Sequence, residues 1–458
     1  MKIKNLIIIG GLVLTFPLLG QNQTVTDAGA IGKVPTTKIE YPEFKKKLNE
    51  SGSQYIKTTM VAQIWSRYTD FNPGTTLNGF TNQTPFDIGI RRVRVNFLAQ
   101  PTDRIFFYAQ FGQNNFNLTS KLNTGAFLHD AVGEYRIHPK MLSLGTGLSG
   151  WSGLTRFSAP GVGSILGVDA PLYQQVTNGI NDQFLRKLSI YAKGKIGKLD
   201  YRLALSNPMT AQNSTVPLGT LNSNSATYSL RPPQLQTQGY LNYQFFDQED
   251  NTLAYTTGTY HGKKKILNIG AGWIEQKGAL WHTQTTNGKL DTINDNMNLL
   301  GADLFFEIPL SEKRNAVTVY VAYTDYQMGK NYIRNLGVMN PSTGSVGNGS
   351  LAGGGNAVPL IGTGQTIFTQ LAYKFKDNLL PEQGTFQIYG SAQISKYQAL
   401  KDNMILYEGG INWLINGDHH SKLTLSVQSR PIFTTNLNGE NVTYSRKGMA
   451  VIQYQISL

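Results

Sequence analysis

The stretch that decides the fold runs from residue 86 to 112 and reads FDIGIRRVRVNFLAQPTDRIFFYAQFG. In its first half, Val93, Val95 and Phe97 share one face, and arginine or asparagine occupies the alternate positions. After the polar break PTD, alternation resumes from Ile105 with aromatic residues. Two alternating segments around a short polar turn predict an antiparallel β-hairpin.

The same period of two continues to the end of the chain and predicts an all-β protein with sixteen strands. The predicted strands span 55–68, 87–100, 104–113, 126–138, 141–149, 185–194, 198–207, 234–246, 264–275, 296–308, 315–327, 364–376, 384–396, 402–415, 420–430 and 446–458. Each has about ten residues or more, which is the length that a strand tilted by about 45° needs to cross a membrane.

The connections between these strands alternate in length. The long ones are 69–86, 114–125, 150–184, 208–233, 276–295, 328–363 and 431–445. Those between them are short, except that 247–263 is long on the short side and 397–401 is short on the long side. This alternation predicts a transmembrane antiparallel β-barrel with short periplasmic turns and long external loops.

The faces of the strands predict which side meets lipid. In the last strand Ile452 and Ile456 share one face, whereas Gln453 and Gln455 share the other. A lumen enclosed by sixteen strands is too wide for side chains to fill, so we expect the polar face to line water and the apolar face to meet lipid. Aromatic residues near the predicted rims are expected to form girdles at the membrane surfaces. They are Trp65, Tyr68, Phe86, Tyr135, Trp273, Phe306, Trp413 and Tyr454.

Composition and the N-terminus agree with a secreted membrane barrel. The 458 residues include no cysteine, which excludes disulfides and thiolate sites, and only 15% are charged. Lys+Arg number 41 against 28 Asp+Glu, a net charge of +13. Two lysines and an apolar run predict a secretory signal peptide at 1–20, which together with the barrel pattern predicts a location in the outer membrane. We expect a polar periplasmic segment at 21–54, with a short helix at Pro42–Asn49, and the barrel at 55–458.

The hairpin Phe86–Gly112 resembles the family of phosphate-selective porins O and P, in its arginine-rich strand, its short turn with Asp and its second, aromatic strand. Glu134-Tyr135 and the run KGKIGKLDY at 193–201 extend the resemblance. The resemblance implies a homotrimeric, sixteen-stranded, anion-conducting porin, with the third long loop folded inward as a constriction. It implies a place in the pore lining for Arg92 and Arg94.

Further candidates come from the predicted faces and loops. The face assignments add eight pore-lining cations: Arg136, Lys187, Lys193, Arg202, Lys374, Lys376, Lys422 and Arg430. Acids expected to share the lumen weaken the preference for anions, and they are Asp130, Glu134, Asp303, Asp325 and Glu408. In loop 150–184 we single out Trp151, Arg156 and Asp169 as constriction residues, although an ordinary exposed loop is an open alternative.

These observations predict a channel for passive diffusion of small, anionic solutes such as phosphate. The alternative is a barrel of another kind, acting as a specific transporter or as a surface adhesion or structural protein. The six histidines are scattered and no hydrolase, zinc or phosphate-loop motif occurs, so we expect no enzyme activity, no cofactor and no metal site. The expected partners are outer-membrane lipid, small anionic solutes and two further copies of the chain, and not nucleic acid.

Overall fold

The computed structural model describes residues 44–82, 84–212, 219, 221–346, 350–415 and 417–458. The predicted signal peptide and most of the predicted periplasmic segment lie outside these ranges. Within them, no helix is long and apolar enough to cross a membrane. The helices present there are two single 3₁₀ turns, η1 (Arg156–Ser158) and η2 (Leu172–Gln174).

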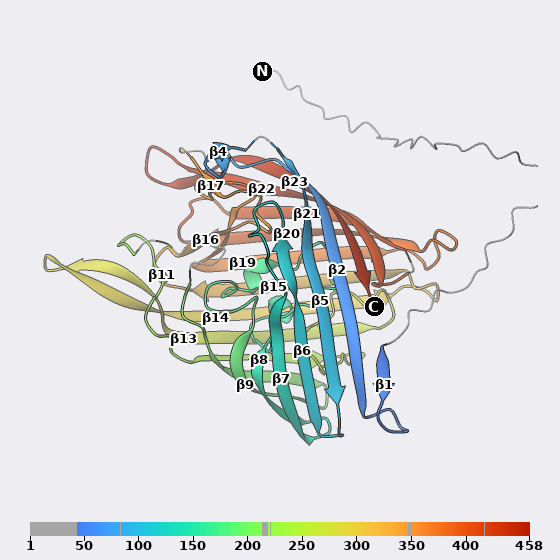
Figure 1. The fold of residues 1–458 in the computed structure, drawn as a ribbon. Coiled ribbons are helices and arrows are strands. Elements are labelled where there is room, and N and C mark those ends of the chain that lie inside the picture. The colour runs from blue at the N-terminus through green and yellow to red at the C-terminus, as the bar shows by residue number, and fades with distance from the viewer. Residues whose placement is uncertain (1–43, 83, 213–218, 220, 347–349, 416) are drawn as a thin grey trace, which may run out of the picture. The chain divides into compact units, whose positions relative to one another are not determined.

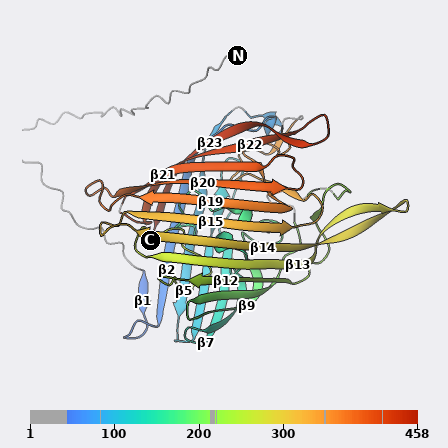
Figure 2. The same ribbon diagram turned by 180° about the vertical axis from the view of Figure 1, so that it is seen from behind.

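Sixteen antiparallel strands form a closed barrel, as the sequence predicted (Figures 1 and 2). They are β2 (Tyr55–Thr69), β5 (Phe86–Gln100), β6 (Ile105–Phe116), β7 (Phe127–His138), β8 (Leu142–Ser149), β9 (Lys187–Ile196), β10 (Leu199–Asn207), β12 (Gln236–Gln244), β13 (Ile266–Thr286), β14 (Lys289–Pro309), β15 (Ala316–Gln327), β19 (Gly364–Lys374), β20 (Thr385–Tyr397), β21 (Met404–Leu414), β22 (Ser421–Thr435) and β23 (Asn441–Ser457). Strand β2 pairs with both β5 and β23, which closes the sheet and leaves no free edge in the wall.

The barrel has two different ends. The turn end carries most of the short connections, and the loop end carries most of the long ones together with six short strands. These strands are β3 (Thr75–Leu77), β4 (Phe80–Thr81), β11 (Thr227–Tyr228), β16 (Ile333–Leu336), β17 (Gly344–Ser345) and β18 (Val358–Gly362).

Two local predictions were wrong. The expected loop 276–295 is a β-ribbon, because β13 and β14 continue pairing past the barrel to the turn at Asn287-Gly288 (Figure 1, the yellow hairpin at the left). Both turn residues have positive φ, 53° and 76°, as a tight hairpin turn requires. The expected helix at Pro42–Asn49 is also wrong in its described part, because β1 (Lys45–Lys47) is a strand paired with the start of β2.

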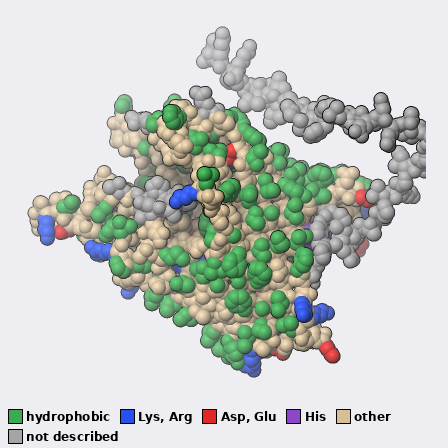
Figure 3. Space-filling model, viewed as in Figure 1, with side chains coloured by type: hydrophobic (Ala, Val, Ile, Leu, Met, Phe, Trp, Pro, Cys, Tyr) green, Lys and Arg blue, Asp and Glu red, His purple; other side chains and the backbone are tan. Residues whose placement is uncertain are grey.

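The apolar faces of the strands point outward and the polar faces inward. Leu425 and Ile452 are 46% and 49% exposed, whereas Gln453 and Gln455 are fully buried. Figure 3 shows apolar side chains over much of the outer wall. One girdle residue was misplaced by the sequence analysis: Trp65 faces the lumen, where its Nε1 donates to Gln453 Oε1 at 2.8 Å. The inner wall also departs from expectation, since inward side chains of β2, β21, β22 and β23 donate to backbone inside the lumen instead of facing open water.

The outward faces generate the first prediction. Val321 lies outward in the middle of β15, so Val321→Arg places a charge where we expect the centre of the bilayer. We expect it to lower the free energy of unfolding by about 2–4 kcal/mol, and Val317→Arg, near the turn end of the same face, by about 1 kcal/mol or less. Urea unfolding in lipid vesicles measures both. Equal effects at the two positions would contradict a lipid-facing wall.

Candidate functional site

Residues 150–184, which make up nearly all of the connection between β8 and β9, lie inside the barrel against the inner wall. Four inward side chains on neighbouring strands donate hydrogen bonds to backbone carbonyls of this segment. They are Gln63 on β2 to Val162 (3.0 Å), Gln455 on β23 to Gly163 (2.8 Å), Lys422 on β22 to Ile165 (2.9 Å) and Asn412 on β21 to Leu166 (2.9 Å). Since these strands follow one another around the sheet, this part of the segment runs along the wall, across the strand direction.

The earlier part of the same segment lies against a strip of wall glycines. Gly272 on β13 and Gly301 on β14 are paired and face inward beneath Leu154. A Cβ on Gly272 would lie 2.5 Å from the Leu154 nitrogen, and one on Gly301 would lie 2.7 Å from the Leu154 oxygen. Both distances are too short for real side chains, so glycine at these positions is what lets the segment approach the wall.

A second segment enters from the turn end. It is the long connection between β12 and β13, residues 245–265, which contains the long connection 247–263 expected from the sequence. Thr256 joins it to the first segment: its N–H donates to the Ala159 carbonyl at 2.9 Å, and its own carbonyl accepts from Gly161 N–H at 2.7 Å. The two segments, one from each end of the barrel, therefore meet inside the lumen.

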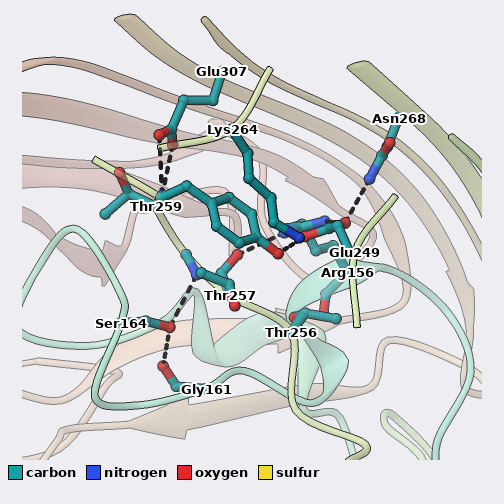
Figure 4. A network of polar contacts seen from close by, with 12 residues as sticks. Arg156, Gly161, Ser164, Glu249, Thr256, Thr257, Thr259, Lys264, Asn268 and Glu307 are labelled. Atoms are coloured by element: carbon teal, nitrogen blue, oxygen red, sulfur yellow. Dashed lines mark hydrogen bonds and ion pairs between the residues drawn. The ribbon is translucent and has the colours of Figure 1, made fainter. Parts of the chain in front are cut away.

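A buried ion pair holds the two segments together (Figure 4). Arg156 donates to both carboxylate oxygens of Glu249, at 2.6 and 2.5 Å, and Tyr260 and Asn268 donate to the same carboxylate at 2.6 and 2.5 Å. Burial alone would raise the pKa of Glu249, but the adjacent Arg156 and these hydrogen bonds outweigh burial and lower it. Conversely, burial alone would lower the pKa of Arg156, and Glu249 outweighs burial and raises it.

A third segment, the described residues of 328–363 between β15 and β19, covers the loop end and contains β16, β17 and β18. Arg67 on β2 donates to its carbonyls at Val338 (2.8 Å) and Met339 (2.7 Å). In turn, Arg334 of this segment donates to the Val176 carbonyl of the first segment at 3.0 Å. The internal segments thus support one another as well as the wall.

A cavity of about 1590 Å³ remains beside these segments, along the wall of β2, β5 and β6. Its lining includes Thr59 and His419 towards the turn end and Asn340 and Gly354 towards the loop end. The cavity therefore extends along the barrel. A second and much smaller cavity, of about 80 Å³, lies between the first segment, including Asp169, and the wall of β19–β23.

Arginines gather on the wall of the larger cavity. Arg91 and Arg92 are neighbours in sequence, yet both are buried on the inner side and both bond to Asp169, Arg91 at 2.7 Å. This is possible because the register of β5 against β2 shifts between Gln63 and Ile64, as at a β-bulge, so that two successive side chains face the lumen.

Arg94 differs from its neighbours in its partners. Among the described residues its guanidinium donates only to amide oxygens, Gln110 Oε1 and Asn114 Oδ1 (2.6 Å), and pairs with no carboxylate. Gln110 Oε1 also accepts from Arg186 Nη2 at 2.9 Å, and Arg186 Nε lies 3.1 Å from Asp130. Burial alone would lower the pKa of Arg186, but Asp130, Tyr255 and Tyr108 together outweigh burial and raise that pKa.

The charges of this cluster do not balance. We define the arginine cluster as Arg91, Arg92, Arg94 and Arg186, with Asp130 and Asp169 as its two carboxylates. Four guanidinium groups against two carboxylates leave 4 − 2 = 2 positive charges in excess.

Among the ten predicted lining residues, Arg92 and Arg94 line the larger cavity. Five of the others are buried and hold internal segments or adjoining loops through their hydrogen bonds. They are Lys187 (to Thr177 Oγ1, 2.9 Å), Lys193 (to Thr252 O, 2.7 Å), Arg202 (to Ala254 O, 2.9 Å), Lys422, as described above, and Arg430 (to Gly355 O, 3.2 Å).

The last three lie at the turn end. Lys374 bonds Asp377 at 2.5 Å, Arg136 donates to the Asp103 carbonyl at 3.1 Å, and Lys376 is exposed in the turn after β19. Lys376 therefore does not stand on the barrel wall as the sequence analysis expected. Among the expected lumenal acids, Asp325 belongs to the outward face of β15.

The three expected constriction residues lie in different places. Asp169 joins Arg92 in the arginine cluster. Trp151 is buried beneath Lys193, whose Nζ lies 4.5 Å from the ring centroid, and Arg156 is in the buried ion pair. Neither Trp151 nor Arg156 is in the lining of the larger cavity. Sequence analysis missed Arg91 and Arg186, although the run of two adjacent arginines in RRVR is itself a signal that strict alternation fails there.

No group of three or more His, Asp or Glu side chains in the described ranges is placed to hold a metal ion. No protein-family model matches the chain, and no curated protein is similar to it in sequence. Solved structures of bacterial porins are similar to it in fold. A mutant of the Rh. blastica porin is 10% identical, with a TM-score of 0.45, over 88% of this chain and 100% of that chain. OmpF of Salmonella typhi, in complex with daunomycin, is 8% identical, with a TM-score of 0.47, over 90% and 99%.

The glycine strip generates the second prediction. Gly301→Val places a side chain against the Leu154 carbonyl, and such overpacking costs about 1–3 kcal/mol. We expect the first segment to leave the wall more often, so that trypsin cuts after Arg156 about tenfold faster. Mass spectrometry of the fragments measures this. Gly133→Val, on the outer side of β7 with open space around it, is the matched control. Equal cutting in the two variants would contradict the packing described.

The ion pair generates the third prediction. Glu249→Gln leaves the buried Arg156 without its counter-charge, and we expect a loss of about 3–5 kcal/mol in stability. Because the pKa of Glu249 is lowered on folding, its contribution is complete above its ordinary value of 4.5 and is lost as the pH falls through the lowered value. Thermal melting in detergent from pH 6 to pH 2 measures both effects.

The matched control for this experiment is Glu440→Gln. Glu440 forms an exposed ion pair with Lys401 at 3.0 Å, and exposed pairs contribute little. We expect its melting curve to follow that of the wild type. If the drop in stability at acid pH persists in Glu249→Gln, a different carboxylate is responsible for it.

Proposed function

We propose that the protein is an outer-membrane porin that lets small anionic solutes, phosphate among them, diffuse passively through the cavity beside β2, β5 and β6. The observation that carries this proposal is the excess of positive charge at the arginine cluster, on the wall of a cavity that extends along a closed barrel. Low-dielectric walls focus the field of such charges and raise the local concentration of anions.

The surroundings support the same proposal. The outward apolar wall suits the lipid of an outer membrane, which a closed barrel can span because every strand is paired. The first segment, residues 150–184, is proposed to narrow the lumen, and Gly301→Val, which loosens it, is expected to raise the conductance. The homotrimer stays a prediction from the family resemblance.

A second candidate is a specific transporter instead of a general diffusion channel. Two internal segments meet inside the lumen and a third covers the loop end, so the path along β5 and β6 is narrower than a sixteen-stranded wall alone would leave. A specific channel shows a small conductance that saturates with solute concentration, whereas a general porin shows a large one that rises with salt.

Planar-bilayer recording tests the proposal and is the fourth prediction. In a KCl gradient we expect a reversal potential on the anion-selective side. Arg94→Gln removes one of the two excess charges and is expected to roughly halve the preference for chloride over potassium. Lys277→Gln removes an exposed charge near the loop end of β13, outside the lining of the cavity, where salt screens it, and is expected to change the preference less.

Two outcomes would contradict the proposal. A cation-selective reversal potential would exclude the anionic solutes, and the absence of any current steps from correctly folded protein would exclude the channel itself.

A further inference from the structure

Part of the lining of the larger cavity is apolar, and an inorganic anion has no apolar surface to place against it. We call this part of the lining the apolar strip. Five half-buried apolar side chains face the cavity, two from the first segment and three from the third. They are Leu172, Phe184, Ile333, Leu336 and Val338. The third segment covers the loop end, so most of this strip lies on the loop-end side of the arginine cluster. Phe184 lies next to the cationic side of the cavity, because its carbonyl accepts a hydrogen bond from Arg186 Nη1 at 2.6 Å.

Arg94 supplies the cationic side of this arrangement. Its side chain is buried, with 4% of the residue exposed, and its described partners are neutral amide oxygens. A buried charge without an opposite charge is unfavourable, so an anion that reaches Arg94 gains more than one that reaches a paired arginine. Arg186 shares the Gln110 oxygen with Arg94, which places two guanidinium groups around one acceptor.

The forked guanidinium fits a carboxylate through two parallel hydrogen bonds. Gln110 Oε1 marks a position where an oxygen already receives hydrogen bonds from both arginines. Because this oxygen belongs to a neutral amide, a charged carboxylate oxygen in its place would form stronger bonds. One carboxylate would also offset one of the two excess charges of the cluster.

We infer that the cavity binds an organic monoanion, a carboxylate with an apolar body of several carbons. Its carboxylate is held by Arg94 and Arg186, and its body lies on the apolar strip. This inference rests on the proposed channel for the way in which the solute arrives, and it narrows the solute class. Inorganic phosphate would leave the apolar strip in water, whereas an apolar body removes that strip from water.

The test compares two probes with the same head group, acetate and hexanoate. Each is added to the wild-type channel in KCl, and the concentration that halves the single-channel current is measured. We expect hexanoate to act at a concentration about tenfold lower than acetate, because its additional methylene groups are buried on the strip. Phosphate, tested in the same way, is expected to need a concentration nearer to that of acetate.

Three variants assign the two parts of the site. Arg94→Gln is expected to raise the half-blocking concentration of both acids about tenfold, and Arg94→Lys to restore part of it, since lysine keeps the charge without the fork. Leu336→Ser is expected to weaken hexanoate alone and so to bring the two acids closer together. Lys277→Gln, the control outside the cavity lining, is expected to leave the ratio of hexanoate to acetate unchanged.

Equal half-blocking concentrations for the two acids, or a hexanoate block that Arg94→Gln leaves unchanged, would overturn the inference. Calorimetry on the full-length protein in detergent measures the same affinities without a current. If hexanoate binds there with the expected preference but no current flows in bilayers, the channel is wrong and the binding site stands. If anion-selective current flows but hexanoate shows no preference in either assay, the channel stands and the inference is wrong.

Discussion

The structure depends on satisfying the hydrogen bonds of a polar inner wall. A sheet of sixteen strands closes because a membrane-facing edge would leave backbone groups without partners, and its polar faces then point to a lumen that side chains cannot fill. In this barrel, backbone carbonyls of an internal segment supply the partners. Inward side chains such as Gln63, Lys422 and Asn412 donate hydrogen bonds to carbonyls of residues 162–166. Buried polar groups of wall and segment satisfy one another.

The need to satisfy the inner wall with internal segments also determines where the open path lies. The first segment lies along the wall over the glycines of β13 and β14, and further on along β23, β22 and β21. The second segment joins it through Thr256 and the Arg156–Glu249 pair. The cavity is left along β5 and β6, where the bulge turns both Arg91 and Arg92 inward. The internal segments thus determine where the cavity is left, and the bulge of β5 supplies the arginines on its wall.

The strands could be predicted from the sequence because a period of two distinguishes the outward face of a strand from its inward face, and long stretches of the wall strands have that period. Asn287-Gly288 was also a usable signal, since this pair favours a tight hairpin turn, yet the length of the connection was interpreted as a loop. The filling of the lumen could not be predicted, because it depends on contacts between residues far apart in sequence, such as Gln455 with Gly163.

The candidate site was predictable only in part, for a similar reason. Strict alternation along a strand places Arg92 and Arg94 on the inward face but places Arg91 on the outward face. One shifted pair in the register reverses the faces of all residues beyond it, so this assignment fails for Arg91. Alternation also cannot distinguish a cation that lines the open path from a cation that holds an internal segment. Lys422 and Arg94 have the same inward direction, and what distinguishes them is the segment that covers one and leaves the other beside the cavity.

The partners of the buried cations give that distinction a physical meaning. Arg430 donates to several backbone carbonyls, which the fold holds in place, so its hydrogen bonds cannot be given up without moving a segment. Arg94 donates to the side-chain amides of Gln110 and Asn114, which can turn away by rotating about their own bonds. An incoming anion can therefore replace the partners of Arg94 while the backbone stays where it is, and this makes Arg94 the cation of the inner wall best suited to exchange its partners with a passing solute.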